Sequence, residues 1–204
     1  EVWEESQGFL DWTIKQKMPT YDLSDKVFVA CNALTILWRE AHPMISSYWK
    51  ELQNAYTTAV EHPGTTITAR MLKFRRDGAW LRIRLPSGRC LCYPSPKAEE
   101  GVCSYMGTNQ YTKRWERQLT YGGKLFENIC QGVARDVMAY AMPEVEKEGY
   151  AIVLTVHDEL ITEAPDLPEF GVDKLSSILA AGNSWTGGMP LAAAGFEAYR
   201  YRKE

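Results

Sequence analysis

The sequence lacks the features that mark several large classes of protein. It has no apolar run of the roughly 20 residues that a bilayer-spanning helix needs, so we expect no membrane segment. Its five cysteines are an odd number at irregular spacing, which argues against a disulfide framework and indicates thiols in a reducing cytoplasm. It also lacks internal repeats and a basic excess: the formal net charge is −3, unlike that of most free-standing nucleic-acid binders.

What the 204 residues contain fits a folded globular domain, or a large piece of one. Hydrophobic residues make up 45% and aromatic residues 12%, which excludes a disordered chain. Basic residues gather in three clusters interleaved with aromatics, and such clusters are either solvated surface or phosphate contacts. They are Arg70, Lys73, Arg75 and Arg76; Lys113, Arg114 and Arg117; and Arg200, Arg202 and Lys203.

Apolar periodicity predicts two helices near the N-terminus. Residues 1–19 show no clear period, and we expect them to be irregular apart from one short helix. From Asp25 the apolar residues fall at helical spacing until Pro43, which breaks that helix and opens a second one. The second helix ends at Pro63-Gly64, and its apolar stripe is Ile45, Trp49, Leu52, Tyr56 and Val60.

Turn signals mark the middle of the chain as a small sheet. Asp77-Gly78 and Ser87-Gly88 each separate alternating segments, which predicts an antiparallel meander over residues 67–93. A polar stretch over residues 94–101 is expected to be a loop.

The C-terminal half is predicted to begin with a long helix. This helix starts near Tyr121 and stops at Pro143, with an apolar stripe of Phe126, Ile129, Val133, Val137 and Tyr140. A short helix over residues 172–181 and a last strand over residues 191–199 are expected to follow.

Residues 152–164, IVLTVHDELITEA, contain two apolar runs that meet at three polar residues. The flanks are rich in β-branched residues and suit a sheet interior, where ionised carboxylates are costly unless paired or bound to metal. We therefore predict a tight hairpin with Asp158 and Glu159 exposed at its apex. Carboxylate oxygens are ligands that Mg²⁺ prefers, so the apex is either a magnesium site or a surface turn with solvated acidic residues.

The same stretch resembles a motif of a known family. VHDEL between two apolar strands resembles motif C, the palm hairpin of family A (DNA polymerase I-like) DNA polymerases. Three further segments resemble phage members of the family, in the family's order: LPSGRCLCYP at 85–94, LTYGGKLFENICQGVARDVMAYAM at 119–142, and the C-terminal LAAAGFEAYRYRKE. The resemblance runs from about residue 30 to the last residue, and four ordered matches are more specific than one.

Two of the family's motifs are absent. No Asp-Tyr-Ser follows an apolar strand, and no Lys-x₆-Tyr-Gly occurs; Tyr121-Gly122 belongs to the later helix. The resemblance thus implies the C-terminal part of a polymerase that carries motif C without the motif A aspartate or the motif B helix. We expect those parts to come from another chain or a missing upstream region, and we expect the isolated chain to be inactive.

The chemistry that the resemblance implies is nucleotidyl transfer, in which a primer 3′-hydroxyl attacks a deoxynucleoside triphosphate and pyrophosphate leaves. Asp158 would bind metal and share two Mg²⁺ ions with the motif A aspartate. Glu159 would tune the water shell of the metal, and His157 would lie over the primer-terminal phosphate. The implied partners are primer-template DNA, deoxynucleoside triphosphates and a second polypeptide with the N-terminal polymerase portion, in a bacterial host's cytoplasm and without a membrane.

The long helix carries a row of hydrogen-bond donors, namely Lys124, Asn128, Gln131 and Arg135. Steps of four, three and four put them on one face, which we expect opposite the apolar stripe. The minor groove offers acceptors at every base pair, so the row is either a solvated face or a DNA contact, and the resemblance implies the contact. Many cellular members have an Asn where this chain has Glu127, so the role of Asn128 is open.

Two further side chains have alternative roles. Arg89 is expected to contact the DNA backbone or to brace the palm. Trp115, beside Lys113 and Arg114, is expected to stack on nucleic acid or to lie in the core.

These features predict an α+β fold: an antiparallel palm sheet with the motif C hairpin, packed on long helices, plus a helical fingers-base segment and a small β meander. The predicted domains are a fingers-base segment (1–62), a meander with its connecting loop (63–118) and a C-terminal palm (119–204). The resemblance implies part of a DNA-directed DNA polymerase; the alternative is a non-catalytic remnant that binds DNA or a partner. Without the motif A strand, we expect the palm sheet to leave an open edge that promotes association.

Overall fold

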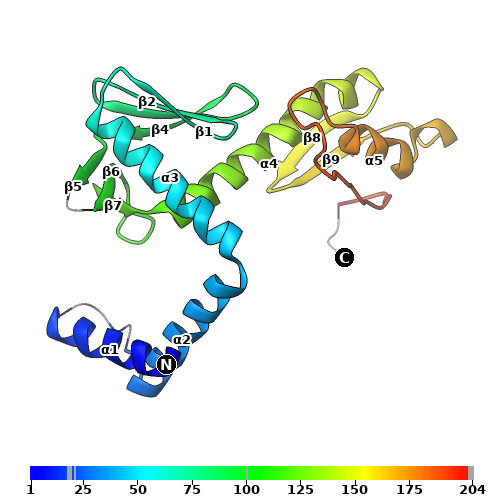
Figure 1. Cartoon of the computed structure of the whole chain (residues 1–204). Coiled ribbons are helices and arrows are strands. Elements are labelled where there is room, and N and C mark those ends of the chain that lie inside the picture. The colour runs from blue at the N-terminus through cyan, green and yellow to red at the C-terminus, as the bar shows by residue number, and fades with distance from the viewer. Residues whose placement is uncertain (18–19, 21, 100, 202–204) are drawn as a thin grey trace.

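A computed structural model of the chain describes residues 1–17, 20, 22–99 and 101–201. Within these residues, helices and antiparallel strands form the α+β fold that the sequence predicts (Figure 1). A helical hairpin stands apart at the N-terminal end, two sheets and two helices form the body, and a strand hairpin lies beside the far half of the longest helix.

The N-terminal hairpin consists of α1 (Val2–Lys15) and α2 (Asp25–Ala41). The prediction of a largely irregular segment with one short helix is wrong in extent, because α1 covers 14 residues; residues 18 and 19 lie outside the described part. The buried positions of α1 are Ser6, Leu10 and Thr13, and two of them are polar, which hides the helical period from a hydrophobicity pattern. The rings of Phe9 and Phe28 stack between the two helices with centroids 6.0 Å apart.

Pro43 separates α2 from α3 (Pro43–Glu61), as the sequence predicts. Proline suits the first position of a helix because its missing N–H would have no partner there. α3 ends directly before His62, Pro63 and Gly64. Of its predicted stripe, Leu52, Tyr56 and Val60 are buried, whereas Ile45 and Trp49 are half-buried.

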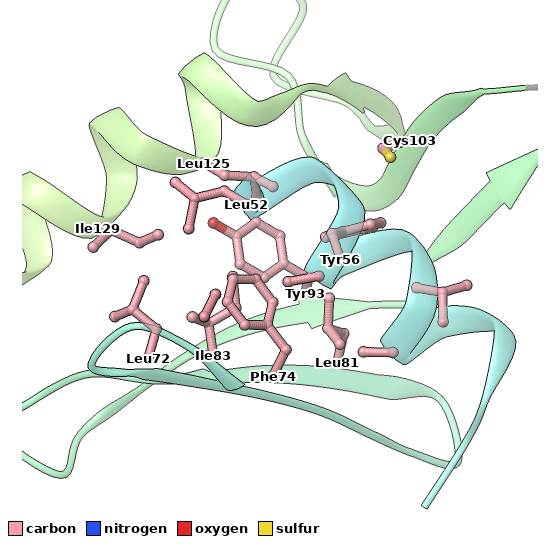
Figure 2. Packing of buried hydrophobic residues seen from close by; sticks show 14 of the residues in the cluster. Leu52, Tyr56, Leu72, Phe74, Leu81, Ile83, Tyr93, Cys103, Leu125 and Ile129 are labelled. Atoms are coloured by element: carbon pink, nitrogen blue, oxygen red, sulfur yellow. The ribbon is translucent and has the colours of Figure 1, made fainter. Parts of the chain in front are cut away.

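The hydrophobic core lies between a four-stranded sheet and the two helices α3 and α4 (Gly122–Lys147) (Figure 2). The sheet runs in the order β1 (Thr66–Ala69), β2 (Leu72–Asp77), β3 (Trp80–Arg84) and β4 (Cys90–Pro94), which confirms the predicted meander. Phe74 on β2 is the register partner of Ile83 on β3, and both side chains are fully buried. Burial alternates along both strands, so one face of the sheet covers the helices and the other meets solvent.

A second antiparallel sheet lies where the sequence predicts loop. β5 (Lys97–Glu99), β6 (Val102–Thr108) and β7 (Trp115–Thr120) pair in that order, so the prediction of a loop over 94–101 is wrong for β5. β6 reads VCSYMGT and buries two consecutive residues, Cys103 and Ser104, which breaks the hydrophobic alternation. The hydroxyl of Tyr56 on α3 donates to the carbonyl oxygen of Ser104 at 2.8 Å and ties this sheet to the core.

α4 is longer than the sequence predicts. It passes through Pro143 and ends at residue 147, so the predicted end at Pro143 is wrong. The stop is Gly149, whose φ of +92° suits the left-handed end of a helix. The amides of Gly149 and Tyr150 donate to the carbonyl oxygens of Glu146 and Val145 at 3.0 and 3.2 Å. These two hydrogen bonds make this helix end a Schellman motif, and Val145 and Tyr150 are both buried there.

The buried face of α4 also differs from the prediction. Only Ile129 of the predicted stripe is buried; Phe126, Val133 and Val137 are half-buried and Tyr140 is exposed. Apart from Val145 near its end, the helix buries Gly122, Leu125, Ile129, Gly132 and Asp136. Two glycines and an aspartate at three of these positions conceal the true face from a count of apolar residues.

The C-terminal part confirms the short helix and refutes the last strand. β8 (Ala151–Val156) and β9 (Glu159–Glu163) are followed by a 3₁₀ turn (Pro168–Phe170) and by α5 (Val172–Ala180). Residues 191–199 form no strand; instead a Glu197 carboxylate oxygen accepts from the amide of Val172 at 2.8 Å. Arg202 and Lys203 lie outside the described residues. None of the helices described is long and apolar enough to cross a membrane.

Candidate functional site

The β8–β9 hairpin displays the candidate catalytic residues. Val156 and Glu159 are register partners, so His157 and Asp158 form a two-residue turn. Asp158 lies at the apex as predicted, whereas Glu159 is the first residue of β9. All three side chains, His157, Asp158 and Glu159, are exposed.

His157 has a left-handed backbone, with φ at +53°. Two-residue hairpin turns require positive φ at their first position, where Gly or Asn is the unstrained choice. A histidine at this position costs about 1 kcal/mol of strain, and such strain gathers at functional sites. The turn therefore holds an imidazole beside Asp158 at some expense of stability.

The hairpin is a two-stranded sheet with open edges. Among the residues that the structure describes, no third strand pairs with β8 or β9. A register shift at Val153 bulges β8, and Val153 and Leu154 are each 51% exposed. Apolar side chains on an unpaired edge form the surface to which a further strand adds.

The hairpin packs against α4 through β8. The turn at Gly149 sends the chain back along the helix, so that β8 runs beside it (Figure 1). Six residues of strand at about 3.3 Å each cover roughly 20 Å, which equals about 13 residues of helix. β8 is therefore about as long as half of α4.

Three of the four predicted donors on α4 are available at the surface. Lys124, Gln131 and Arg135 are exposed, and the Gln131 amide donates to the Glu127 carboxylate over 3.4 Å. The row lies beside the buried face, about 100° round the helix, because each member directly precedes a residue of that face; the predicted opposite placement is wrong.

Asn128 is used inside the protein. Its amide donates to the hydroxyl of Tyr93 on β4 at 3.1 Å. Burial raises the pKa of Tyr93 to about 12, although the hydrogen bond from Asn128 acts in the opposite direction. The shifted spacing of Asn128 thus corresponds to a brace between α4 and the meander.

Arg89 also braces the meander against α4. Its Nε pairs with one carboxylate oxygen of Asp136, and its Nη2 donates to the carbonyl oxygen of Gly132 at 2.8 Å. The hydroxyl of Ser87 donates to the other Asp136 oxygen. Of the two roles expected for Arg89, this geometry supports the bracing one.

Asp136 is a residue that sequence reasoning missed. Its carboxylate is buried and paired on both oxygens, which is what a buried charge requires. Its position in the sequence could have indicated its burial, because Asp136 continues the three- and four-residue spacing of Leu125, Ile129 and Gly132 on one face of α4.

Two glycines let the elements that carry the site approach closely. A Cβ on Gly122 would lie 1.8 Å from the carbonyl oxygen of Trp49 on α3, so this position admits glycine alone. A Cβ on Gly132 would lie 3.0 Å from Leu85 and 3.3 Å from Leu91. α4 is therefore fixed at close range to both α3 and the meander.

The acidic residues do not form a complete metal site. Within the described ranges, no group of three or more His, Cys, Asp or Glu side chains lies close enough to hold a metal ion. Asp158 offers an exposed carboxylate of the kind that Mg²⁺ binds, with Glu159 next to it in the chain. A hard cation takes about six oxygens, so Asp158 fits as one ligand of a set completed elsewhere.

Trp115 lies at the surface, so its interpretation as a core residue is wrong. The side chain is 62% exposed at the start of β7, next to the exposed Lys113 and Arg114.

Comparison with known proteins finds a phage enzyme. The chain is 35% identical over 173 residues to the DNA polymerase of Bacillus phage SP02. The match covers 82% of this chain and 26% of the phage protein, so the chain spans about a quarter of the length of that relative. No family model matches the chain, and no solved structure matches it.

Proposed function

We propose that the chain is the C-terminal part of a DNA-directed DNA polymerase of family A, with motif C on the β8–β9 hairpin. The observation that carries the proposal is the similarity to a phage DNA polymerase along 82% of the chain, combined with an exposed aspartate at the hairpin apex. The substrates are then primer-template DNA and deoxynucleoside triphosphates, in the cytoplasm of a bacterial host.

Asp158 is proposed to hold Mg²⁺ through its carboxylate. Two bound Mg²⁺ ions lower the pKa of the primer hydroxyl and neutralise charge on the leaving pyrophosphate. Glu159 accepts hydrogen bonds from water around the metal, and His157 donates one to the primer-terminal phosphate. The left-handed turn keeps His157 and Asp158 exposed at the apex, with the exposed Glu159 directly after them at the start of β9.

The chain supplies half of the site. A second aspartate, on a strand beside β8–β9, completes the oxygen ligands of the metals. The open edges of the hairpin and the exposed Val153 and Leu154 support such a neighbouring strand from a second polypeptide or a longer chain. The isolated chain is therefore inactive in this proposal.

Exposed donors on α4 are proposed to contact the minor groove of the primer-template duplex. Lys124, Gln131 and Arg135 present N–H groups, and every base pair offers acceptors there, so the contact senses pair geometry without reading sequence. Asn128 takes no part, because its amide is bound to Tyr93.

The test is primer extension with Mg²⁺ and all four deoxynucleotides. The chain is assayed alone and together with the remaining N-terminal portion of a related phage polymerase. Asp158→Asn is the test variant, and Glu163→Gln, an exposed carboxylate at the other end of β9, is the matched control.

We expect no extension from the chain alone, extension from the mixture, and loss of that extension in Asp158→Asn but not in Glu163→Gln. If the chain alone extends the primer and Asp158→Asn abolishes this extension, the chain contains a complete active site. That result would refute the proposal that a second portion supplies the other metal-binding aspartate. No extension in either case would favour the non-catalytic binding remnant.

A further inference from the structure

The β6–β7 tip, residues 109–115, carries aromatic and basic side chains at the surface. Tyr111 is 95% exposed and Trp115 is 62% exposed. Lys113 and Arg114 lie between them in the sequence and are also exposed. None of these four side chains makes a hydrogen bond, ion pair or ring contact with another described residue.

The backbone of the tip is held in one shape by Asn109. Its side-chain oxygen accepts from the amides of Tyr111 and Thr112 at 2.8 and 3.1 Å. Its backbone amide donates to the backbone carbonyl oxygen of Arg114 at 2.8 Å, and its backbone carbonyl oxygen accepts from the amide of Lys113 at 2.9 Å. The aromatic and basic groups therefore project from a fixed turn, which lowers the entropy lost on binding.

The tip is also locally positive, although the whole chain has a formal net charge of −3. The carboxylate that follows the tip in the sequence, Glu116, accepts from the side-chain amide of Asn109 at 2.6 Å and from the Thr112 hydroxyl at 3.3 Å. It makes no ion pair with Lys113 or Arg114. Two unpaired cations thus lie between two unpaired aromatic rings.

We propose that the β6–β7 tip binds single-stranded nucleic acid, with unpaired bases stacked on Tyr111 and Trp115 and phosphates bound by Lys113 and Arg114. Aromatic rings interleaved with cations are how proteins hold single strands without reading their sequence. A membrane surface fits less well, because the tip also presents Asn109, Gln110 and Thr112 and has no continuous apolar face. The choice of a nucleic acid as occupant rests on the proposed polymerase function, for which the strand is the unpaired template.

The test measures the affinity of the whole 204-residue chain for a fluorescein-labelled oligothymidylate by fluorescence anisotropy at several salt concentrations. One variant is Tyr111→Ala with Trp115→Ala, and a second is Lys113→Gln with Arg114→Gln. The matched control is Trp3→Ala with Lys15→Gln, an aromatic residue 53% exposed and an exposed cation on α1, away from the tip in Figure 1.

We expect the aromatic pair to weaken binding at least tenfold and the control to leave it within twofold. The charge pair should flatten the dependence of log affinity on log salt by about 1.4, since each phosphate contact on a single strand contributes about 0.7. Circular dichroism checks folding, and Tyr111→Ala alone, at a fully exposed position, serves if a double variant misfolds.

Equal affinities of the tip variants and the wild type would overturn the proposal, and so would an equal loss in the control. Tip-dependent binding to phosphatidylserine vesicles without oligonucleotide binding would assign the tip to a membrane instead. Asp158→Asn should bind the oligonucleotide normally. Failure of primer extension with tip-dependent binding intact would therefore reject the polymerase proposal and leave this one standing.

Discussion

Replacing Asp136 with alanine should loosen the turn of residues 85–89 from α4 and destabilise the fold by about 2–3 kcal/mol. Breaking a fully buried ion pair by removing one partner costs about 3–5 kcal/mol. The Asp136 side chain is only 9% exposed, but that of Arg89 is 47% exposed, so water partly compensates the released guanidinium and the expected loss is smaller. Asp136→Asn keeps the volume and an acceptor for Arg89, and should cost about 1 kcal/mol.

Urea denaturation followed by circular dichroism measures these losses, and a double-mutant cycle with Arg89→Ala isolates the pair. We expect a coupling energy of at least about 1 kcal/mol, because the two side chains are in direct contact. Asp77→Asn is the control: its pairs with Arg75 and Arg82 are exposed, and their loss should change stability by no more than about 0.5 kcal/mol. A coupling below about 0.5 kcal/mol between Arg89 and Asp136 would refute the bracing role.

Three further changes test the core, the helix contact and the buried tyrosine. Phe74→Ala should reduce the free energy of unfolding by about 3–5 kcal/mol in the same assay, because its ring is fully buried between the sheet and the helices. Gly122→Ala should destabilise the chain strongly or prevent folding, since its Cβ would overlap the Trp49 carbonyl at 1.8 Å; wild-type circular dichroism and melting temperature would contradict that contact. Burial raises the pKa of Tyr93 from 10.0 to about 12, so the neutral phenol stabilises the fold below pH 10, and this contribution is lost as pH rises from 10 to 12. The urea midpoint should fall between pH 10 and pH 12, and should fall less in Tyr93→Phe.

Sequence reasoning located the elements whose signals are local. Pro43 and the turn pairs Asp77-Gly78 and Ser87-Gly88 act on their own backbone, so their effects do not depend on distant packing. The hairpin at Asp158 was predictable for the same reason, because polar residues interrupt two apolar strands.

The wrong predictions for α1, α4 and β6 share a physical cause. Which residues of an element are buried depends on the elements packed against it, and these are distant in the sequence. Ser6 and Thr13 lie in a buried helix face, and Gly132 and Asp136 in another, so the hydrophobic period is incomplete in both. β6 buries adjacent residues in place of alternating ones.

Distant pairing explains the site residue that was missed. The role of Asp136 depends on Ser87 and Arg89, which lie 49 and 47 residues away in the sequence. The role of Asp158 stays a prediction that the primer-extension assay decides, and the roles of Glu159 and His157 stay predictions.

The N-terminal hairpin of α1 and α2 joins the body at the bend before Pro43, so a small rotation there displaces the far end of the hairpin. α2 has 17 residues and is about 25 Å long, and it projects from α3 away from the sheets (Figure 1). The short connection at His42 has φ of −124° and ψ of 59°, outside the helical range, so the chain changes direction at this residue. The His42 amide still donates to the Trp38 carbonyl oxygen at 3.0 Å, and the Ser46 hydroxyl donates to the Arg39 carbonyl oxygen at 3.2 Å across the bend. A rotation of about 10° at that connection would carry the far end of α2, with α1 packed on it, through about 4 Å. Small torsional adjustments at one residue are thus magnified into displacements large enough to make or break a side-chain contact.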